Sequence, residues 1–265
     1  MRPVNQCSLY SVFMEMCTTN KNDSTPLVLM SATGFIYEHN GDKYLISNWH
    51  VFSAKDPNDP GKFLPGVGGD PEYVKVYFPN ESAVDTSTIQ EYPLINEARD
   101  KLWKEHPKSR LVDVAALKVD LPSGVATRVI NEVIRNEMFF DREKIFHITR
   151  EVWVVGFPKG VRIAGLPIWK RATIASEPRY SSQEVEHKII LDTATREGMS
   201  GSPVLYVNGE FTPIQFDGTN QEIDHASVKL LLGIYSGRIA GQDELSAQLG
   251  IVWSGDCLAE IFSGT

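Results

Sequence analysis

The sequence contains few cysteines: Cys7, Cys17 and Cys257 are the only three in 265 residues. Three is an odd number, so they cannot all pair in disulfides within one chain. Their spacing fits no cysteine arrangement that binds a metal ion. We therefore expect three plain thiols, and nothing in the sequence indicates a metal ion or an organic cofactor.

Long hydrophobic runs are also absent. No segment approaches eighteen uninterrupted apolar residues, which is about the length that a membrane-spanning helix needs. The first six residues, Met1–Gln6, lack the apolar core of a secretory signal peptide. We therefore expect no membrane partner.

Positive charge is in the minority. Lysine and arginine number 26 against 34 aspartates and glutamates, which gives a formal net charge of −8 at pH 7. A protein that binds nucleic acid needs clustered positive charge to neutralise phosphates, so we expect no nucleic-acid partner. A chain of 265 residues with 42% hydrophobic residues can instead build a large core, as one domain or as two closely packed halves.

The chain does contain many strand-like segments. An Asn-Gly pair between apolar runs is a strong signal for a β-hairpin, and two such pairs occur. The first is predicted to join Thr33–Glu38 to Lys43–Asn48, and the second to join Pro203–Val207 to Glu210–Phe216. Further strands are predicted at Tyr73–Phe78, Val112–Val119, Val152–Phe157, Ile168–Ala175, Lys188–Leu191, Leu230–Tyr235 and Gly250–Trp253.

Helices and long loops are predicted at only a few places. Asn96–Glu105 and Asn131–Asn136 have the placement of charged and apolar residues that is typical of short helices. Ser53–Asp70 is rich in proline and glycine, which predicts an irregular surface loop.

The most informative segment is Arg196–Val204, with the sequence Arg-Glu-Gly-Met-Ser-Gly-Ser-Pro-Val. It places Ser200 in a tight turn between Gly198 and Gly201, directly before an apolar strand. A serine hydroxyl is a poor nucleophile unless the backbone exposes it and a base removes its proton. Glycine permits both the close approach of a substrate carbonyl and the backbone angles of such a turn. Taken alone, the segment fits a surface loop of small residues equally well.

Two other segments supply a base and an acid. Tyr44–Phe52 runs an apolar strand into His50, and Val112–Val119 places Asp113 at the start of an otherwise apolar run. A buried aspartate fixes the tautomer of an imidazole and stabilises its protonated form, and the imidazole can then deprotonate a serine. The order along the chain is histidine, aspartate, serine.

Three segments of this kind in this order resemble those of the trypsin-like serine endopeptidases, the chymotrypsin-fold family. The α/β-hydrolases and the subtilisins carry the same residue types in other orders. The resemblance covers about residues 27–255. Gly156–Pro158 and Gly198–Pro203 make the chain most similar to the disulfide-free, intracellular, bacterial-type branch, which implies a cytoplasmic location.

The resemblance also implies a fold. It is an all-β architecture of two six-stranded antiparallel Greek-key β-barrels, with the active site in the cleft between them. Residues 1–145 would form the N-terminal barrel, which carries the histidine and the aspartate. Residues 146–265 would form the C-terminal barrel, which carries the serine and the specificity pocket.

Roles follow from the resemblance residue by residue. Ser200 would be the nucleophile, His50 the general acid and base, and Asp113 the group that orients His50. The backbone N–H groups of Gly198 and Ser200 would form the oxyanion hole, whose donors are worth roughly 3–4 kcal/mol each. The other histidines lie in no matching motif and are expected to be polar surface residues: His39, His106, His147, His187 and His225. Asp192 and Asp120 are expected not to be catalytic.

Substrate-binding residues are implied at Ala194, Thr195, Glu197, Ser236, Gly237 and Arg238. Ala194 stands six positions before the serine, where the family has the base of the primary pocket. It carries no charge, so we expect a preference for apolar or small side chains, although a pocket built around Arg238 would prefer acidic ones. The segment Gly233–Arg238 resembles the strand that pairs with the substrate backbone.

The resemblance implies a protein or peptide substrate. Met199 stands where members that are activated from zymogens carry an aspartate, so activation by insertion of a new N-terminus is not expected. A ligand or a regulatory protein partner that orders loops around Ser200 is a hypothesis for control. Ser53–Asp70 and Asp217–Asp224 are the candidates for the moving parts or the contact surface.

Two alternatives remain at this stage. The chain could be a catalytically silent binding or scaffold module on the same fold, because a fold does not guarantee a function. It could also be a serine esterase or acyltransferase that uses the same three residues on a non-peptide acyl group.

Overall fold

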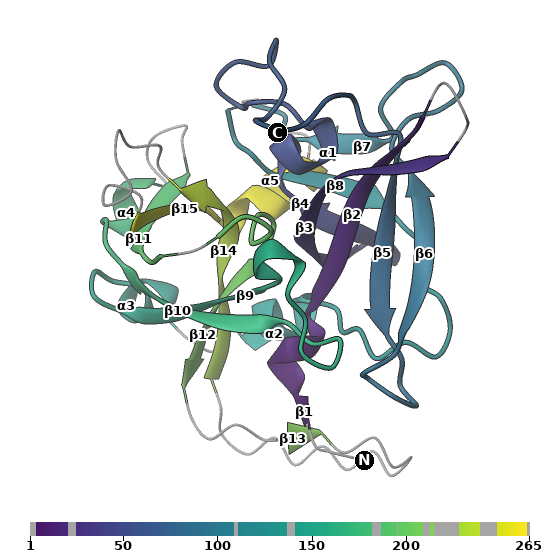
Figure 1. The fold of residues 1–265 in the computed structure, drawn as a ribbon. Coiled ribbons are helices and arrows are strands. Elements are labelled where there is room, and N and C mark those ends of the chain that lie inside the picture. The colour runs from purple at the N-terminus through teal and green to yellow at the C-terminus, as the bar shows by residue number, and fades with distance from the viewer. Residues whose placement is uncertain are drawn as a thin grey trace.

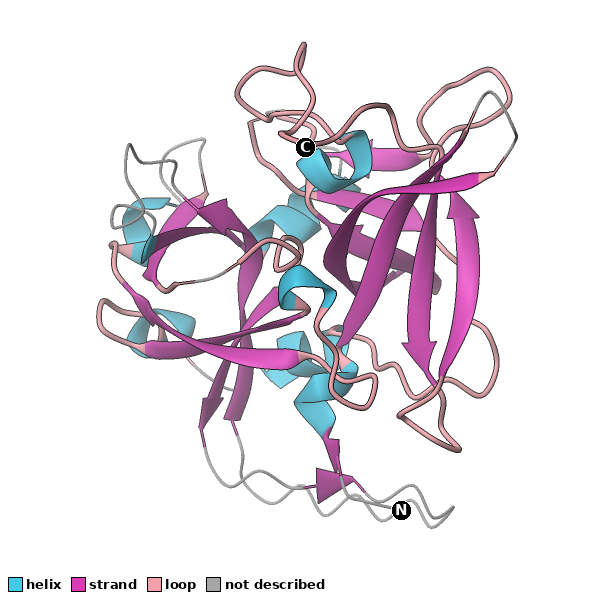
Figure 2. Cartoon of the chain, viewed as in Figure 1, coloured by secondary structure: helices cyan, strands magenta, loops and turns pink. Residues whose placement is uncertain are grey.

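The computed structural model describes residues 4–20, 25–108, 111–136, 141–181, 187–194, 196–208, 213–214, 228–238 and 248–263. This part of the chain forms two β units that lie side by side (Figure 1). Strands make up most of its regular structure and the helices are short (Figure 2). The longest described helix has eight residues, and no described helix is long and apolar enough to cross a membrane.

The first unit is a seven-stranded antiparallel sheet with the order β6-β5-β2-β3-β4-β8-β7. Its strands are β2 (Ser11–Thr19), β3 (Pro26–His39), β4 (Asp42–Ser47), β5 (Tyr73–Pro79), β6 (Ser87–Pro93), β7 (Trp103–Glu105) and β8 (Ala115–Lys118). The predicted hairpin between β3 and β4 is confirmed. Asn40 and Gly41 both have positive φ, 52° and 83°, which is the geometry of the turn that suits the twist of two paired strands.

The second unit is a closed antiparallel barrel of six strands with the order β10-β11-β15-β14-β12-β9. Its strands are β9 (Glu151–Gly156), β10 (Ile168–Ile174), β11 (Lys188–Asp192), β12 (Pro203–Asn208), β14 (Val228–Arg238) and β15 (Leu249–Ser254). The all-β, two-barrel fold class is therefore confirmed, with seven strands in the first sheet where six were predicted.

The remaining elements are short. They are η1 (Gln6–Leu9), α1 (Trp49–Ser53), α2 (Asn131–Asn136), α3 (Arg142–Ile145), η3 (Pro158–Gly160), α4 (Pro178–Ser181), α5 (Asp256–Ser263) and the strand pair β1 (Val4–Asn5) with β13 (Pro213–Ile214). The helix predicted at Asn131–Asn136 is confirmed.

Two predictions about these segments are wrong. The segment Asn96–Glu105, predicted as a helix, is a turn followed by β7. The reason is that Trp103 is buried in the hydrophobic core of the first sheet, and its segment pairs with β8 at the edge of that sheet. In the second predicted hairpin, Gly209 and all of Glu210–Phe216 except Pro213 and Ile214 lie outside the described residues. Those two residues pair with β1, while β12 pairs with β14 and β9.

The two units share a core between them. It combines buried residues of the first sheet, such as Phe35 and Val114, with buried residues of the barrel, such as Leu205 and Trp253. Helix α5, yellow in Figure 1, adds three buried residues to the same cluster: Cys257, Leu258 and Ile261. This shared core holds the facing ends of the two units in a fixed relation.

The three cysteines are buried and free, as expected for plain thiols. Cys257 lies in the shared core, and its burial raises the pKa of its thiol above the usual range.

Candidate active site

Strand pairing brings His50 and Asp113 to the same end of the first sheet. In the antiparallel pair of β4 and β8, Ser47 lies opposite Ala115. His50 follows Ser47 by three residues on α1, and Asp113 precedes Ala115 by two. Two residues that are 63 positions apart in sequence therefore meet beyond one strand end.

Asp113 is buried, with 1% of its surface exposed, and three donors face its carboxylate. The backbone N–H of His50 donates to Oδ1 at 2.8 Å, and Nδ1 of the same residue lies 2.6 Å from Oδ2. The hydroxyl of Ser236 also donates to Oδ2. These donors offset the cost of burying a charged carboxylate. When Nδ1 of His50 donates to Asp113, its Nε2 carries the lone pair that can accept a proton.

Ser200 lies in the turn that leads into β12 and is half-buried. Its hydroxyl donates to the carbonyl of Ser236 at 3.0 Å. Within the described part of the chain, no hydrogen bond joins the Ser200 hydroxyl to His50. Ser236 thus contacts both partners, Asp113 through its side chain and Ser200 through its carbonyl. Rotation about the Cα–Cβ bond of Ser200 can move the hydroxyl between staggered positions.

The turn before Ser200 depends on Gly198. Its φ is +87°, and a Cβ atom placed on it would lie 2.4 Å from the carbonyl oxygen of Phe157. Only glycine fits both conditions. The amide of Met199 donates to the Arg196 carbonyl at 3.3 Å, whereas the amides of Gly198 and Ser200 have no acceptor among the described residues. Two such free N–H groups are the kind of donor that stabilises a developing oxyanion.

Thr33 of β3 ties this turn to the first unit. Its hydroxyl donates to the Gly198 carbonyl at 2.8 Å and accepts from the Phe157 amide at 3.1 Å, and its amide donates to the Ser200 carbonyl at 2.9 Å. Thr33 is fully buried. The sequence analysis did not single out Thr33, because its polar partners come from segments more than 120 residues away.

The residues implied in substrate binding are described only in part. Ala194 and Glu197 are exposed, and Ser236 and Gly237 are half-buried. Thr195 and the side chain of Arg238 lie outside the described residues. The ladder pairing of β14 with β12 ends at Ile234, and Tyr235 still exchanges backbone hydrogen bonds with Ser202 and Gly201. Beyond Tyr235, the described chain pairs Gly237 and Arg238 with β15 alone. That end of β14 has one edge on which a further strand can pair.

The other acids and histidines differ in their surroundings. Asp192 and Asp120 are exposed, as expected for residues outside the site. His147 is exposed, and His225 lies outside the described residues. The expectation of surface histidines is wrong for His106 and His187: His106 is buried and His187 is half-buried, and both contact the C-terminal helix.

Sequence comparison agrees with the fold. The trypsin-like peptidase domain family matches residues 32–212, a span of more than half of the chain that contains His50, Asp113 and Ser200. A search of curated proteins finds no similar protein. The chain therefore belongs to the trypsin-like peptidase domain family and has the chymotrypsin fold of its peptidases.

Proposed function

We propose that this protein is a serine endopeptidase that hydrolyses peptide bonds through an acyl-enzyme intermediate. A peptidase domain implies protein or peptide substrates. The observation that carries the proposal is the set of three donors around the buried Asp113 carboxylate, two of which come from His50. Burying a carboxylate is costly, and this set of donors holds Asp113 where its carboxylate orients the imidazole of His50.

The proposed chemistry begins with Ser200. His50 Nε2 accepts the hydroxyl proton while Oγ attacks the substrate carbonyl carbon, and the carbonyl oxygen becomes an oxyanion. The free amides of Gly198 and Ser200 support its stabilisation by hydrogen bonds. Protonated His50 then gives the proton to the leaving amine, and the acyl group stays on Ser200. Water, deprotonated by His50, releases the acyl group in a second pass through the same steps.

Asp113 acts through His50. Its carboxylate accepts from Nδ1, which leaves Nε2 in the acceptor form and stabilises the imidazolium that arises. Before attack, the Ser200 hydroxyl has to leave the Ser236 carbonyl and turn toward Nε2. We propose that the substrate backbone pairs with β14 beyond Tyr235, where one edge of the strand is open in the described chain.

The proposal is tested by cleavage of a mixture of unstructured peptides, analysed by mass spectrometry. Wild type is expected to cut internal peptide bonds, and Ser200→Ala to cut none. Asp113→Asn is expected to reduce kcat by about 10⁴-fold, because its amide nitrogen would face His50 and Ser236 and so favour the wrong imidazole tautomer. Asp120→Asn is the matched control, because this exposed aspartate lies two residues after β8, the strand that Asp113 precedes.

Other outcomes would point to the alternatives. Turnover of activated esters with no peptide cleavage would indicate an esterase or acyltransferase. Peptide binding with no turnover of either substrate class would indicate a binding module. Equal activity in wild type and Ser200→Ala would refute the assignment of the nucleophile.

A further inference from the structure

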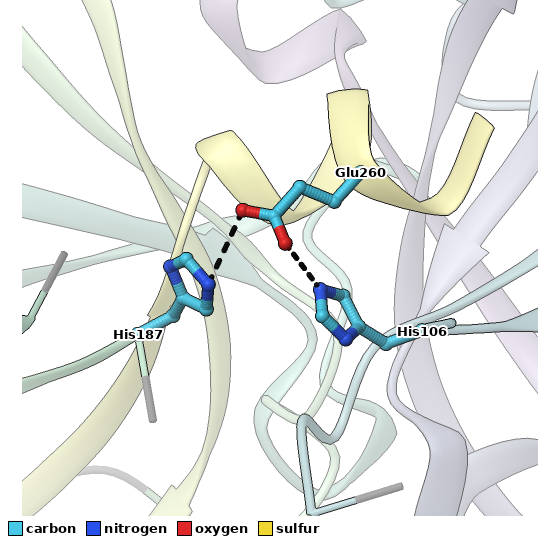
Figure 3. Close-up of side chains that lie close together, drawn as sticks. All are labelled: His106, His187 and Glu260. Carbon is cyan, nitrogen blue, oxygen red and sulfur yellow. Dashed lines mark hydrogen bonds and ion pairs between the residues drawn. The ribbon is translucent and has the colours of Figure 1, made fainter. Parts of the chain in front are cut away.

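A second cluster of side chains lies away from Ser200, where the two β units meet the C-terminal helix. It consists of His106, His187 and Glu260 (Figure 3). His106 directly follows β7 of the first sheet, His187 directly precedes β11 of the barrel, and Glu260 lies on α5. Three segments that are distant in sequence therefore present their polar atoms to one point.

The geometry of the cluster is compact. Nε2 of His106 lies 3.0 Å from one carboxylate oxygen of Glu260, and Nε2 of His187 lies 3.2 Å from the other. One ligand atom from each of the three residues lies within 4.8 Å of the other two. Around a tetrahedral zinc ion with bonds of about 2.0–2.1 Å, neighbouring ligand atoms lie about 3.3 Å apart. The two short separations involve different oxygens of Glu260, so with one ligand atom from each residue the atoms need to approach one another by at most about 1.5 Å.

We propose that His106, His187 and Glu260 bind a divalent transition-metal ion, with Zn²⁺ as the best fit. Two imidazoles and one carboxylate form a donor set that suits zinc, and a water molecule would complete the tetrahedron. The two neutral imidazoles and the single carboxylate leave a net charge of about +1 on the occupied site. The ion would join the first sheet, the barrel and α5, so its role is to fasten the fold rather than to act on substrate.

The surroundings of the cluster leave room for a bound cation. The side chains of His106 and Glu260 are 1% and 23% exposed, so the cluster is largely shielded from solvent. The ammonium group of Lys108 lies 3.9 Å from Glu260 and would compete with a cation. Its side chain is 59% exposed, so it can turn into solvent when an ion binds.

One feature of the site limits its affinity. Nδ1 of His187 is buried and has no hydrogen-bond partner in the described chain. When Nε2 binds a metal, Nδ1 carries the proton, and this N–H would lack the acceptor that usually supports a metal-bound histidine. We therefore expect binding about 10–100-fold weaker than that of a site with full support for both imidazoles.

The test uses the full-length protein, treated with EDTA, dialysed, and titrated with zinc sulfate in a calorimeter. We expect one Zn²⁺ per chain and a rise in the unfolding temperature with zinc concentration, because an ion that binds only the folded state stabilises it. His187→Gln and Glu260→Gln should each weaken binding by at least about 100-fold. His147→Gln removes an exposed histidine outside the cluster and should bind zinc as wild type does.

The result that overturns the proposal is the absence of zinc binding to wild type, or binding of equal affinity in wild type and both cluster variants. Glu260→Gln keeps the shape of the side chain but replaces one acceptor oxygen with a donor NH₂ group, so its folding is checked by circular dichroism. If that variant fails to fold, the visible absorption spectrum of Co²⁺ added to the wild-type protein tests the site instead. Intense visible absorption bands of tetrahedral Co²⁺ would support the site, and the weak bands of hydrated Co²⁺ would overturn it. None of these outcomes depends on peptidase activity.

Discussion

Thr33 is the side chain through which the first β unit fixes the turn around Ser200. Its hydroxyl and amide make three hydrogen bonds to segments of the second unit. The two hydroxyl bonds are buried, and the amide bond reaches the carbonyl of Ser200 itself. Because the Gly198 and Ser200 carbonyls are two of its partners, Thr33 fixes the peptide groups that directly follow those whose amides face the proposed oxyanion. Thr33 is therefore a positioning residue for the proposed reaction.

Thr33→Val keeps the shape of the side chain but removes its hydroxyl. The Gly198 carbonyl and the Phe157 amide would then be buried without a partner, which costs about 1–3 kcal/mol for each group. We expect kcat to fall roughly tenfold to a hundredfold, since about 1.4 kcal/mol of lost transition-state stabilisation corresponds to a factor of ten. KM should change little. Steady-state kinetics on a cleaved peptide measures both constants.

Thr33→Ser is the matched control, because serine retains the hydroxyl. It should keep most of the activity that Thr33→Val loses. If the serine variant is as impaired as the valine variant, retaining the hydroxyl does not preserve activity, and the positioning role of the hydroxyl is wrong.

At the scale of single residues, the sequence points to the candidate catalytic residues but not to the residues that hold them in place. Ser200, His50 and Asp113 were singled out because each sits in a local motif. Ser236 was assigned to substrate binding, and its bond to Asp113 could not be foreseen, because it depends on how β14 crosses the end of the first sheet. The cluster around Glu260 gave no local signal at all, since its three members come from separate segments.

Among the secondary-structure elements, strands with clear turn signals were the most predictable. The β3–β4 hairpin and the barrel strands around Val154 and Ile190 follow from alternating or apolar runs beside turn residues. β2 was not predicted, because Ser11–Thr19 is buried along most of its length and shows no alternation. Packing between strands, and not local preference, decides such segments.

The end of β2 is held by Glu72, which precedes β5. The carboxylate of Glu72 accepts from the Thr19 amide at 3.1 Å and from Arg99 at 3.2 Å. The Thr19 amide is the main cause of a pKa for Glu72 below its usual range, and Arg99 adds to the effect. These contacts stabilise the ionised carboxylate in the folded state.

This environment predicts a pH dependence of stability. Because the folded-state pKa of Glu72 is lowered, its contribution to the free energy of unfolding is present above the unfolded pKa of about 4.3. It is lost as the pH falls through the folded pKa. Glu72→Gln should therefore destabilise the protein by at most about 1 kcal/mol at pH 7, as for a surface pair, and by almost nothing in strong acid.

Urea unfolding of both proteins at a series of pH values measures this difference. A gap between wild type and Glu72→Gln that stays constant from neutral to acidic pH would show that the charge of Glu72 is not the cause.

The whole molecule is held together by the core between its units. α5 closes this core with Leu258 and Ile261, while Phe262 stacks on Tyr37 and His39 of the first sheet. The sequence predicts an all-β fold but gives no signal for α5, because eight residues are too few for a clear helical period. The two-unit architecture was predicted from a resemblance that rests on short motifs. The shared core between the units was not predicted and is seen only in the structure.

Leu258→Ala tests the contribution of α5. Leu258 is 1% exposed, so the smaller side chain leaves a cavity between the two units and should lower the free energy of unfolding by about 2–5 kcal/mol. Ala259→Ser on the exposed face of the same helix should change it by less than about 0.5 kcal/mol. Chemical denaturation measures both. Similar effects of the two substitutions would mean that α5 does not belong to the shared core.

The most direct test of the proposed activity is labelling with an active-site-directed fluorophosphonate, followed by peptide mapping of the modified residue. The reagent reacts with a serine only where a base and oxyanion donors are assembled around it. We predict modification of wild type at Ser200 alone and none of Ser200→Ala. A folded wild-type protein that is not labelled, or labelling that persists in Ser200→Ala, would contradict the assignment of Ser200 as the nucleophile.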